Sequence, residues 1–239
     1  MNILAIGNSF SMDATRYLHQ IAKADGVEMS VVNLYIGGCP LYRHFKNMHE
    51  DAKSYTLQYN GESTGFLVSI KEALLNREWD IVTMQQASRG SVNYETYQPY
   101  LDELSAYVKK YAPKAKQLIH QTWAYEEGSD LLCKTMGYSK RIDMYNDIKV
   151  AYDKAAEAIG TEIIPSGTLF QNMIEAGIDN IHRDTFHASL GVSRYALALL
   201  WYRKFTGNDV TANTFCDFDE AVSEKEIEIV KNCVANINL

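Results

Sequence analysis

Short apolar segments alternate with helical segments along almost the whole chain, and this alternation constrains the fold more than any other feature of the sequence. Strands are predicted at residues 2–6, 29–34, 79–86, 117–120 and 162–165, and helices at 13–25, 68–76, 99–111, 138–159, 189–205 and 223–234. Helices that separate successive strands favour a parallel sheet covered on both faces. We therefore predict a three-layer, flavodoxin-like α/β fold with a doubly wound sheet of about five parallel strands.

One long interval, residues 41–65, interrupts the alternation. It is polar and rich in tyrosine, and residues 55–59 within it are predicted as a hairpin strand closed by Asn60-Gly61. His44 and His49 also fall in this interval. Because their neighbours in sequence are polar, both are predicted to be solvated surface histidines.

The length and composition fit one globular domain. No repeat, linker or low-complexity segment divides the chain, and its 239 residues, 46% of them hydrophobic, are enough for one well-filled core. We predict a single domain over residues 1–239. The four cysteines show no CxxC spacing, so neither a zinc site nor a disulfide framework is indicated.

Charge and hydropathy restrict the partners. A net charge of −7 without a basic stripe argues against nucleic acid. The first residues lack the charged and apolar regions of a signal peptide, and the longest apolar stretch, residues 195–202, is too short to span a membrane. The sequence therefore predicts a cytoplasmic protein with no membrane partner, and a secreted mature form stays open. The oligomeric state is not predicted.

Polar loops follow the predicted strands at the edge where an open α/β sheet binds its ligand. These loops are Gly7-Asn8-Ser9, Gly37-Gly38, Gln85-Gln86-Ala87-Ser88, and the loop that contains Trp123. Ser9 stands at a turn from strand to helix. Such a serine is a nucleophile, a helix cap or part of an anion-binding loop, depending on its partners.

The segment Arg183-Asp184-Thr185-Phe186-His187 offers such partners. A carboxylate three residues before a histidine can hold one imidazole nitrogen, which leaves the other nitrogen to act as a general base. A serine hydroxyl needs such a base to attack an ester, and the resulting oxyanion needs preorganised donors. The N–H of Ser9, a glycine N–H from Gly37-Gly38 and a side-chain amide after the third strand would supply them.

These segments resemble the blocks of a known family. Ile6-Gly7-Asn8-Ser9-Phe10-Ser11, Gly37-Gly38 and Asp184-Thr185-Phe186-His187 look like the first, second and last blocks of the SGNH (GDSL-type) hydrolases, in the same order, and closest to a bacterial branch that opens with Gly-Asn-Ser-Phe-Ser. The resemblance implies that Ser9 is the nucleophile, His187 the base and Asp184 its partner. It also implies that Gly38 is the oxyanion glycine.

The sequence departs from the family pattern at two places. Asn8 replaces the usual aspartate before the serine. The third block, Gly-x-Asn-Asp, is absent, and Gln85-Gln86-Ala87-Ser88-Arg89 stands in its position. Gln86 is predicted to donate the third oxyanion hydrogen bond, with Gln85 and Ser88 as alternatives.

The predicted function is a serine esterase that removes small acyl groups, chiefly acetyl, from carbohydrate esters through a covalent acyl-enzyme. Trp123 and Tyr125 are predicted to line its substrate pocket, although buried core aromatics are an equal alternative. No cofactor is expected, and no residue completes a metal site around His182, Asp184 and His187. Two other classes stay open: a phosphate- or nucleotide-binding flavodoxin-like module, and a catalytically weak carbohydrate-binding protein of the same fold.

Overall fold

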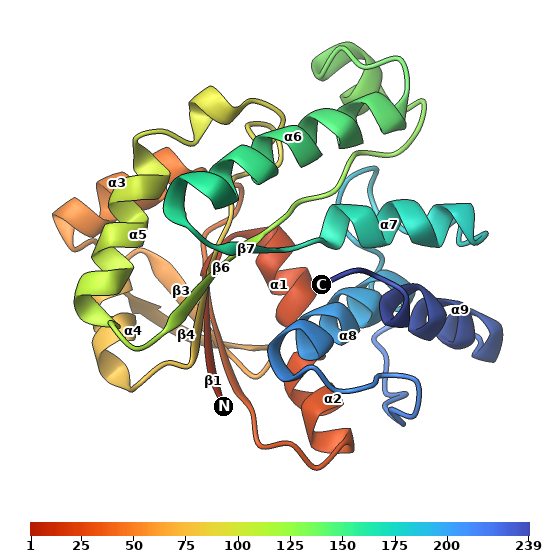
Figure 1. Ribbon diagram of the computed structural model, residues 1–239, viewed down its shortest axis with the longest axis horizontal. Coiled ribbons are helices and arrows are strands. Elements are labelled where there is room, and N and C mark those ends of the chain that lie inside the picture. The colour runs from red at the N-terminus through yellow and green to blue at the C-terminus, as the bar shows by residue number, and fades with distance from the viewer.

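A seven-stranded sheet lies at the centre of the computed structural model, which describes residues 1–239 (Figure 1). The strand order is β4-β3-β2-β1-β5-β6-β7. The strands are β1 (Asn2–Gly7), β2 (Ser30–Tyr35), β3 (Tyr55–Tyr59), β4 (Glu62–Val68), β5 (Ile81–Met84), β6 (Lys116–His120) and β7 (Glu162–Ile164). Five of them, β2-β1-β5-β6-β7, pair in parallel, and β3 and β4 add an antiparallel hairpin at one edge. The predicted fold class is confirmed, with the hairpin as an addition to the parallel sheet.

Helices cover both faces of the sheet (Figure 1). They are α1 (Ser9–Thr15), α2 (Leu18–Ala24), α3 (Leu41–Glu50), α4 (Ile70–Asn76), α5 (Tyr100–Tyr111), α6 (Arg141–Ile159), α7 (Ser166–Glu175), α8 (Val192–Thr206) and α9 (Glu224–Ala235). One layer holds α3, α4, α5 and α6. The other holds α1, α2, α7 and α8, and α9 packs outside α7 and α8. No helix is both long enough and apolar enough to cross a membrane.

Two helices were not predicted from the sequence. Helix α3 lies inside the interval 41–65, and its inward face carries His44 and Asn47 between apolar residues, which hides the helical periodicity. His44 is fully buried, contrary to the prediction of a surface histidine, whereas His49 is exposed. Burial lowers the pKa of His44 to about 3. The second missed helix, α7, follows β7 directly.

The first predicted helix also differs from the observed one. Helix α1 begins at Ser9, not at residue 13. The helix is interrupted at Arg16 and Tyr17, and α2 begins at Leu18. The short strand β1 therefore passes into a helix after a single turn residue, Asn8. This places Ser9 at the N-terminus of a helix and at the carboxyl edge of the sheet.

The predicted hairpin turn at Asn60-Gly61 is confirmed. Both residues have positive φ angles, 51° and 89°, as a two-residue turn between twisted strands requires. A Cβ on Gly61 would lie 2.2 Å from the carbonyl oxygen of Arg16, so the hairpin approaches the break between α1 and α2 too closely for any side chain. The edge hairpin is thus held against the segment that follows the site.

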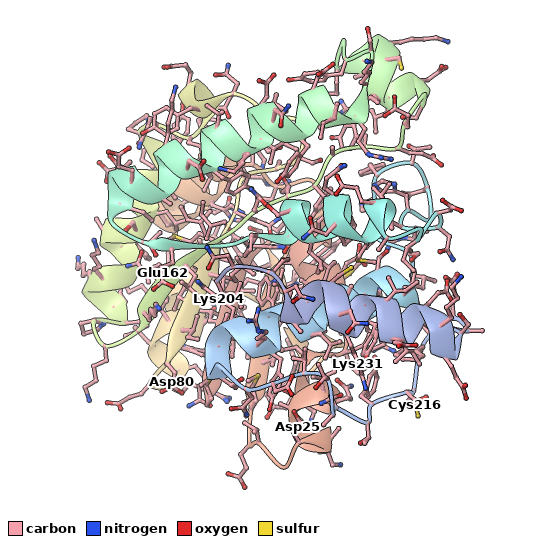
Figure 2. All side chains as sticks on the ribbon, turned by 45° about the vertical axis from the view of Figure 1, so that its right-hand side comes forward. Asp25, Asp80, Glu162, Lys204, Cys216 and Lys231 are labelled. Atoms are coloured by element: carbon pink, nitrogen blue, oxygen red, sulfur yellow. The ribbon has the colours of Figure 1, made fainter.

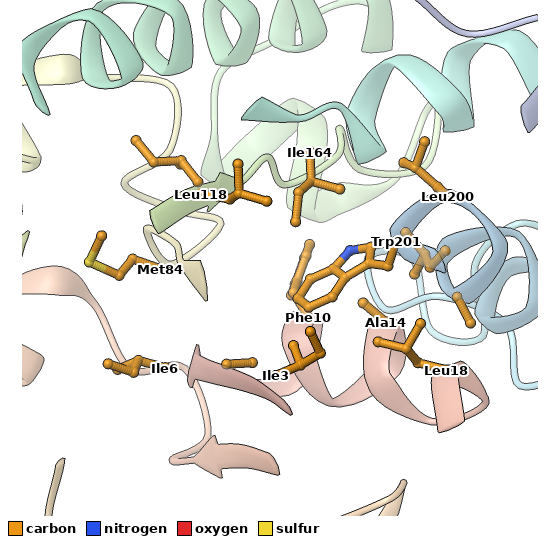
Figure 3. Close-up of a cluster of buried hydrophobic side chains, with 14 of the residues drawn as sticks. Ile3, Ile6, Phe10, Ala14, Leu18, Met84, Leu118, Ile164, Leu200 and Trp201 are labelled. Carbon is orange, nitrogen blue, oxygen red and sulfur yellow. The ribbon is translucent and has the colours of Figure 1, made fainter. Parts of the chain in front are cut away.

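Apolar packing fixes the position of the β1–α1 turn. Phe10 and Ala14 of α1, and Leu18 of α2, lie on the side of α8 that carries Trp201, in a continuous buried cluster (Figure 3). Helix α8 is buried on nearly all sides, because α1, α2, α7 and α9 surround it. Burial of several large apolar side chains contributes about 1.5–3 kcal/mol each, so the turn rests on a stable support.

Several charged side chains, including those of Asp25, Asp80 and Lys231, lie at the periphery of the molecule, and other charged side chains form ion pairs (Figure 2). The pair between Lys204 and Glu162 joins α8 to β7, with the ammonium 2.7 Å from the carboxylate. Hydrogen bonds from Lys116 and from Lys204 lower the pKa of Glu162 to about 2. The Glu162 side chain is 52% exposed, whereas the Lys204 side chain is only 6% exposed, so this ion pair is partly withdrawn from solvent.

Candidate active site

The site is built at the carboxyl end of β1, between β2 and β5, where the direction of strand addition reverses. Asn8 has extended backbone and caps α1, since its Oδ1 accepts the N–H of Phe10 at 3.0 Å. Gly7 allows this tight turn, because a Cβ there would lie 2.4 Å from Ser11 Oγ and 2.9 Å from Gln85 Oε1. The cap leaves the N–H of Ser9 without an intrahelical acceptor.

A chain of buried hydrogen bonds holds Asn8 in place. Asn8 Nδ2 donates to the carbonyl of Cys39 at 3.1 Å, and Gln85 Nε2 donates to Asn8 Oδ1 at 2.8 Å. Gln85 Oε1 lies 2.9 Å from His120 Nδ1, so this nitrogen carries the proton of a neutral ring. Burial lowers the pKa of His120 to about 3. Asn8 therefore connects the first strand end to the loop after β2.

Ser9, His187 and Asp184 form a continuous hydrogen-bonded series. Ser9 Oγ lies 2.8 Å from His187 Nε2, and His187 Nδ1 lies 2.7 Å from Asp184 Oδ2. The backbone N–H of His187 also donates to Asp184 Oδ1 at 2.9 Å. Burial alone would raise the pKa of Asp184, but the hydrogen bonds from His187 outweigh it and hold the pKa below its usual value. Both carboxylate oxygens are thus used to orient one histidine.

Backbone strain shapes the loop that carries this pair. Thr185 has a φ of +73°, a left-handed conformation that a β-branched residue rarely adopts. Its carbonyl accepts the N–H of Glu126 at 2.8 Å, which helps to hold the conformation. The reversal at Thr185 turns the side chain of Asp184 back toward His187.

Aromatic side chains pack against the imidazole of His187 and hold its neighbour Phe186. The ring of Phe186 lies 3.9 Å from that of His187, centroid to centroid, and the indole of Trp123 donates to the carbonyl of Phe186 at 2.8 Å. Trp123 is fully buried between Phe10, at 4.1 Å, and Phe170, at 4.6 Å. It lies beneath the site and does not line the pocket, so the core alternative holds for Trp123.

An ion-pair cluster joins the same loop to α1. Arg183 places one guanidinium nitrogen 2.9 and 3.0 Å from the two carboxylate oxygens of Asp13, and the Nε of Arg194 lies 2.9 Å from Asp13 Oδ1. Asp13 is completely buried, and Arg194 also binds Asp219. Since Asp13 follows Ser9 on α1 and Arg183 precedes Asp184, the cluster ties the two halves of the series together.

A pocket of about 560 Å³ opens over this series. Its lining residues are Asn8, Ser9, Phe10, Met12, Tyr35, Gly37, Gly38, Ala87, Ser88, Arg89, Tyr125, Leu131, Arg183, Phe186 and His187. The predicted residues Ser9, Gly38, Tyr125 and His187 are therefore brought together. Tyr35 and Leu131 were not predicted, because an apolar or aromatic side chain at a strand end or in a loop carries no distinct sequence signal.

Gln86 does not take the predicted position. Its Nε2 donates to the carbonyl of Thr96 at 2.8 Å, and its Oε1 accepts the N–H groups of Leu41 and Ala87 at 2.9 and 2.8 Å. The amide thus holds the loop after β5 against α3 and does not line the pocket. Of the three candidates for an oxyanion donor in this loop, Ser88 alone lines the pocket, with its Oγ 2.8 Å from Tyr125 Oη.

Gly38 also lines the pocket, and its backbone N–H is free. It has a φ of +61°, which favours glycine, and no acceptor in the protein takes its N–H. The neighbouring Cys39 is fully buried, and burial raises the pKa of its thiol to about 12, which removes it as a nucleophile. His182 places Nε2 3.1 Å from the carbonyl of Ala124. No cluster of three or more His, Cys, Asp or Glu side chains is arranged to hold a metal ion.

Comparison with known families identifies the family to which the sequence belongs. A family model described as "Domain of unknown function (DUF4886)" matches residues 2–237. The chain belongs to the DUF4886 family. A crystal structure of a DUF4886 family protein from Bacteroides uniformis is 34% identical in sequence and has a TM-score of 0.92, over 99% of this chain and 93% of that chain. No curated protein matches this DUF4886 sequence significantly.

More distant solved structures share the fold of this DUF4886 protein. A protein from Slackia heliotrinireducens, proposed to be an SGNH hydrolase, is 27% identical with a TM-score of 0.61, over 85% of this chain and 97% of that chain. An acetylxylan esterase from Geobacillus stearothermophilus is 16% identical with a TM-score of 0.55, over 86% of this chain and 94% of that chain. The DUF4886 protein therefore has the fold of the SGNH hydrolases.

Proposed function

We propose that the protein is a serine esterase that hydrolyses small acyl esters, chiefly acetyl esters of carbohydrates. One observation carries the proposal: Asp184, His187 and Ser9 are hydrogen-bonded in series at the wall of a pocket. A serine hydroxyl backed by an oriented imidazole is the arrangement that acyl transfer requires. The esterases among the structures of similar fold agree with this chemistry, and one of them is an acetylxylan esterase.

The reaction follows from the geometry. Ser9 Oγ attacks the ester carbonyl carbon while His187 Nε2 takes the hydroxyl proton, and Asp184 holds the opposite ring N–H and stabilises the imidazolium. The tetrahedral intermediate then expels the alcohol, which receives the proton from His187. A water molecule, deprotonated by the same nitrogen, attacks the acyl carbon. The bond to Ser9 Oγ then breaks, the carboxylic acid leaves, and Ser9 Oγ takes back its proton from His187.

The developing oxyanion needs donors that are already in place. The N–H of Ser9 at the positive end of α1 and the free N–H of Gly38 are two of them. We assign the third position to the hydroxyl of Ser88, which lines the pocket where Gln86 does not. In this arrangement Asn8 positions the loop of Gly38 through the carbonyl of Cys39 and does not donate to substrate.

Replacement of Ser9 tests the proposal directly. We expect S9A to lower kcat for p-nitrophenyl acetate at least about 1,000-fold, since loss of the nucleophile removes the covalent route. Exposed Ser139, far from Ser9 in sequence and not part of the pocket lining, provides the matched control S139A. A fluorophosphonate probe should label the wild-type protein and S139A but not S9A. Full esterase activity in S9A would overturn the mechanism, and absence of labelling in the wild-type protein would favour a binding module.

A further inference from the structure

Two arginines line the pocket of this acidic protein. Its lining includes Arg89 and Arg183 and no aspartate or glutamate, although the whole chain has a net charge of −7. Asp13 compensates the charge of Arg183, and Asp184 pairs with His187, so Arg89 is the charged residue of the lining that no carboxylate pairs with.

The two arginines differ in what they are free to bind. Arg183 is occupied, because its guanidinium contacts both oxygens of Asp13 and the carbonyl of Ala188. Arg89 forms no ion pair, and its side chain has no hydrogen-bond partner in the protein, while its charge lies near enough to act on the hydroxyl of Tyr125. Arg89 is thus the unpaired cation of the pocket.

The backbone that carries Arg89 is fixed on both sides. The N–H of Gly90 donates to the carbonyl of Ala87 at 2.9 Å, and Ser91 Oγ donates to the carbonyl of Ser88 at 2.7 Å. Ser88 itself bonds to Tyr125 across the pocket wall. The Cα of Arg89 therefore has a defined position at the pocket, and only the side chain has to order on binding.

We infer that the pocket selects esters that also carry a carboxylate group, which Arg89 binds at the opening. This inference rests on the proposed esterase function and names the class of its substrate, such as an acylated acidic sugar. A guanidinium offers a planar pair of N–H donors that fits the two oxygens of a carboxylate. The lining also includes the apolar side chains of Phe10, Met12 and Leu131, and a pocket with apolar side chains and one unpaired cation suits an ester with one charged end and an uncharged acyl end.

Two esters with the same acyl group test the inference. 4-Acetoxybenzoate carries a carboxylate, and its methyl ester is neutral. We expect R89Q to lower kcat/KM for 4-acetoxybenzoate about twofold to fivefold, and for the methyl ester less than about 1.5-fold, as for an ion pair at an exposed site. Comparing the ratio of the two substrates between proteins removes their different leaving-group reactivity. Raising the salt concentration to 1 M should reduce the preference of the wild-type protein.

Arg43 on α3 provides the matched control, since it is exposed and does not line the pocket. R43Q makes the same change of charge and should leave the substrate ratio unchanged. An equal loss for both substrates in R89Q, or an equal shift of the ratio in R43Q, would overturn the inference while leaving the esterase mechanism intact.

A binding measurement tests the inference without turnover. Calorimetry should show that the product 4-hydroxybenzoate binds the wild-type protein with a lower Kd than methyl 4-hydroxybenzoate does. In R89Q the two Kd values should be equal. Equal binding of both compounds to the wild-type protein would overturn the inference. Undiminished hydrolysis by S9A, by contrast, would overturn the proposed role of Ser9, whereas the binding difference would still test the role of Arg89.

Discussion

Replacing Asp13 by asparagine tests how the ion-pair cluster holds the site together. The carboxylate is completely buried and contacts two guanidinium groups, whose side chains are 22% and 11% exposed. D13N keeps the shape but removes the charge that compensates both arginines. Loss of one partner from a buried ion pair costs about 3–5 kcal/mol.

The structure sets the expected size of the effect within this range. Arg194 keeps its ion pair with Asp219, and Arg183 keeps its hydrogen bond to the carbonyl of Ala188. We therefore expect D13N to lower the free energy of unfolding by about 3 kcal/mol, at the lower end. For a chain of this size that corresponds to a fall in Tm of about 6–12 °C. Thermal unfolding followed by circular dichroism measures it.

Activity gives a second readout of the same change. Because Asp13 and Ser9 share α1, and Arg183 adjoins Asp184, a loosened cluster should misplace the base and lower kcat about 10- to 100-fold at temperatures where D13N stays folded. The control E78Q also removes a carboxylate that pairs with a cation, but the side chains of Glu78 and Lys114 are 80% and 75% exposed. It should shift Tm by less than about 4 °C. A shift in D13N no larger than in E78Q, with kcat unchanged, would refute the reasoning.

Two further predictions concern the hydrogen bonds around the site. D184N should lower kcat at least about 100-fold, because the amide no longer fixes the tautomer of His187. Since the pKa of Asp184 is lowered in the folded protein, its ionised form stabilises the fold above the ordinary aspartate pKa of about 4, and this contribution disappears as the pH falls through the lowered value. Urea unfolding from pH 7 to pH 3 should show the stabilities of D184N and the wild type converging at the acid end, and a constant difference would contradict this. Q85L should lower the free energy of unfolding by about 1–3 kcal/mol, because it leaves His120 Nδ1 unpaired and removes one hydrogen bond to Asn8. A change below about 0.5 kcal/mol in urea unfolding would mean that these buried hydrogen bonds contribute nothing to stability.

Local patterns explain which parts of the site the sequence predicts. The turn after β1 is marked by a short apolar run that ends in Gly-Asn-Ser, and Asp184 and His187 are only three positions apart. Both features can therefore be identified without knowledge of the fold. The parallel sheet follows from the alternation of strands and helices. It brings the loops after β1, β2 and β5 to one edge whatever the details of packing.

Features that depend on distant partners could not be predicted in this way. The amide of Gln86 binds Thr96 and Leu41, which tertiary packing brings to it, and these contacts decide its orientation. His44 is buried because α3 turns it toward Tyr55, 2.9 Å from the tyrosine hydroxyl. The cluster around Asp13 joins residues about 170 and 181 positions apart, and no local pattern marks such a pair.

The hydrogen bond between Ser9 and His187 spans 178 positions of the chain. During synthesis the first strand leaves the ribosome early, yet it becomes a central strand of the sheet, and helix α1 finds its main support, α8, only after residue 192 has been made. A nascent chain that has completed all seven strands still lacks the histidine, its aspartate and the helix that supports the serine. The proposed nucleophile thus stays without its proposed base until the last quarter of the polypeptide has folded onto the first helix. The proposed ester hydrolysis would therefore report directly on complete folding.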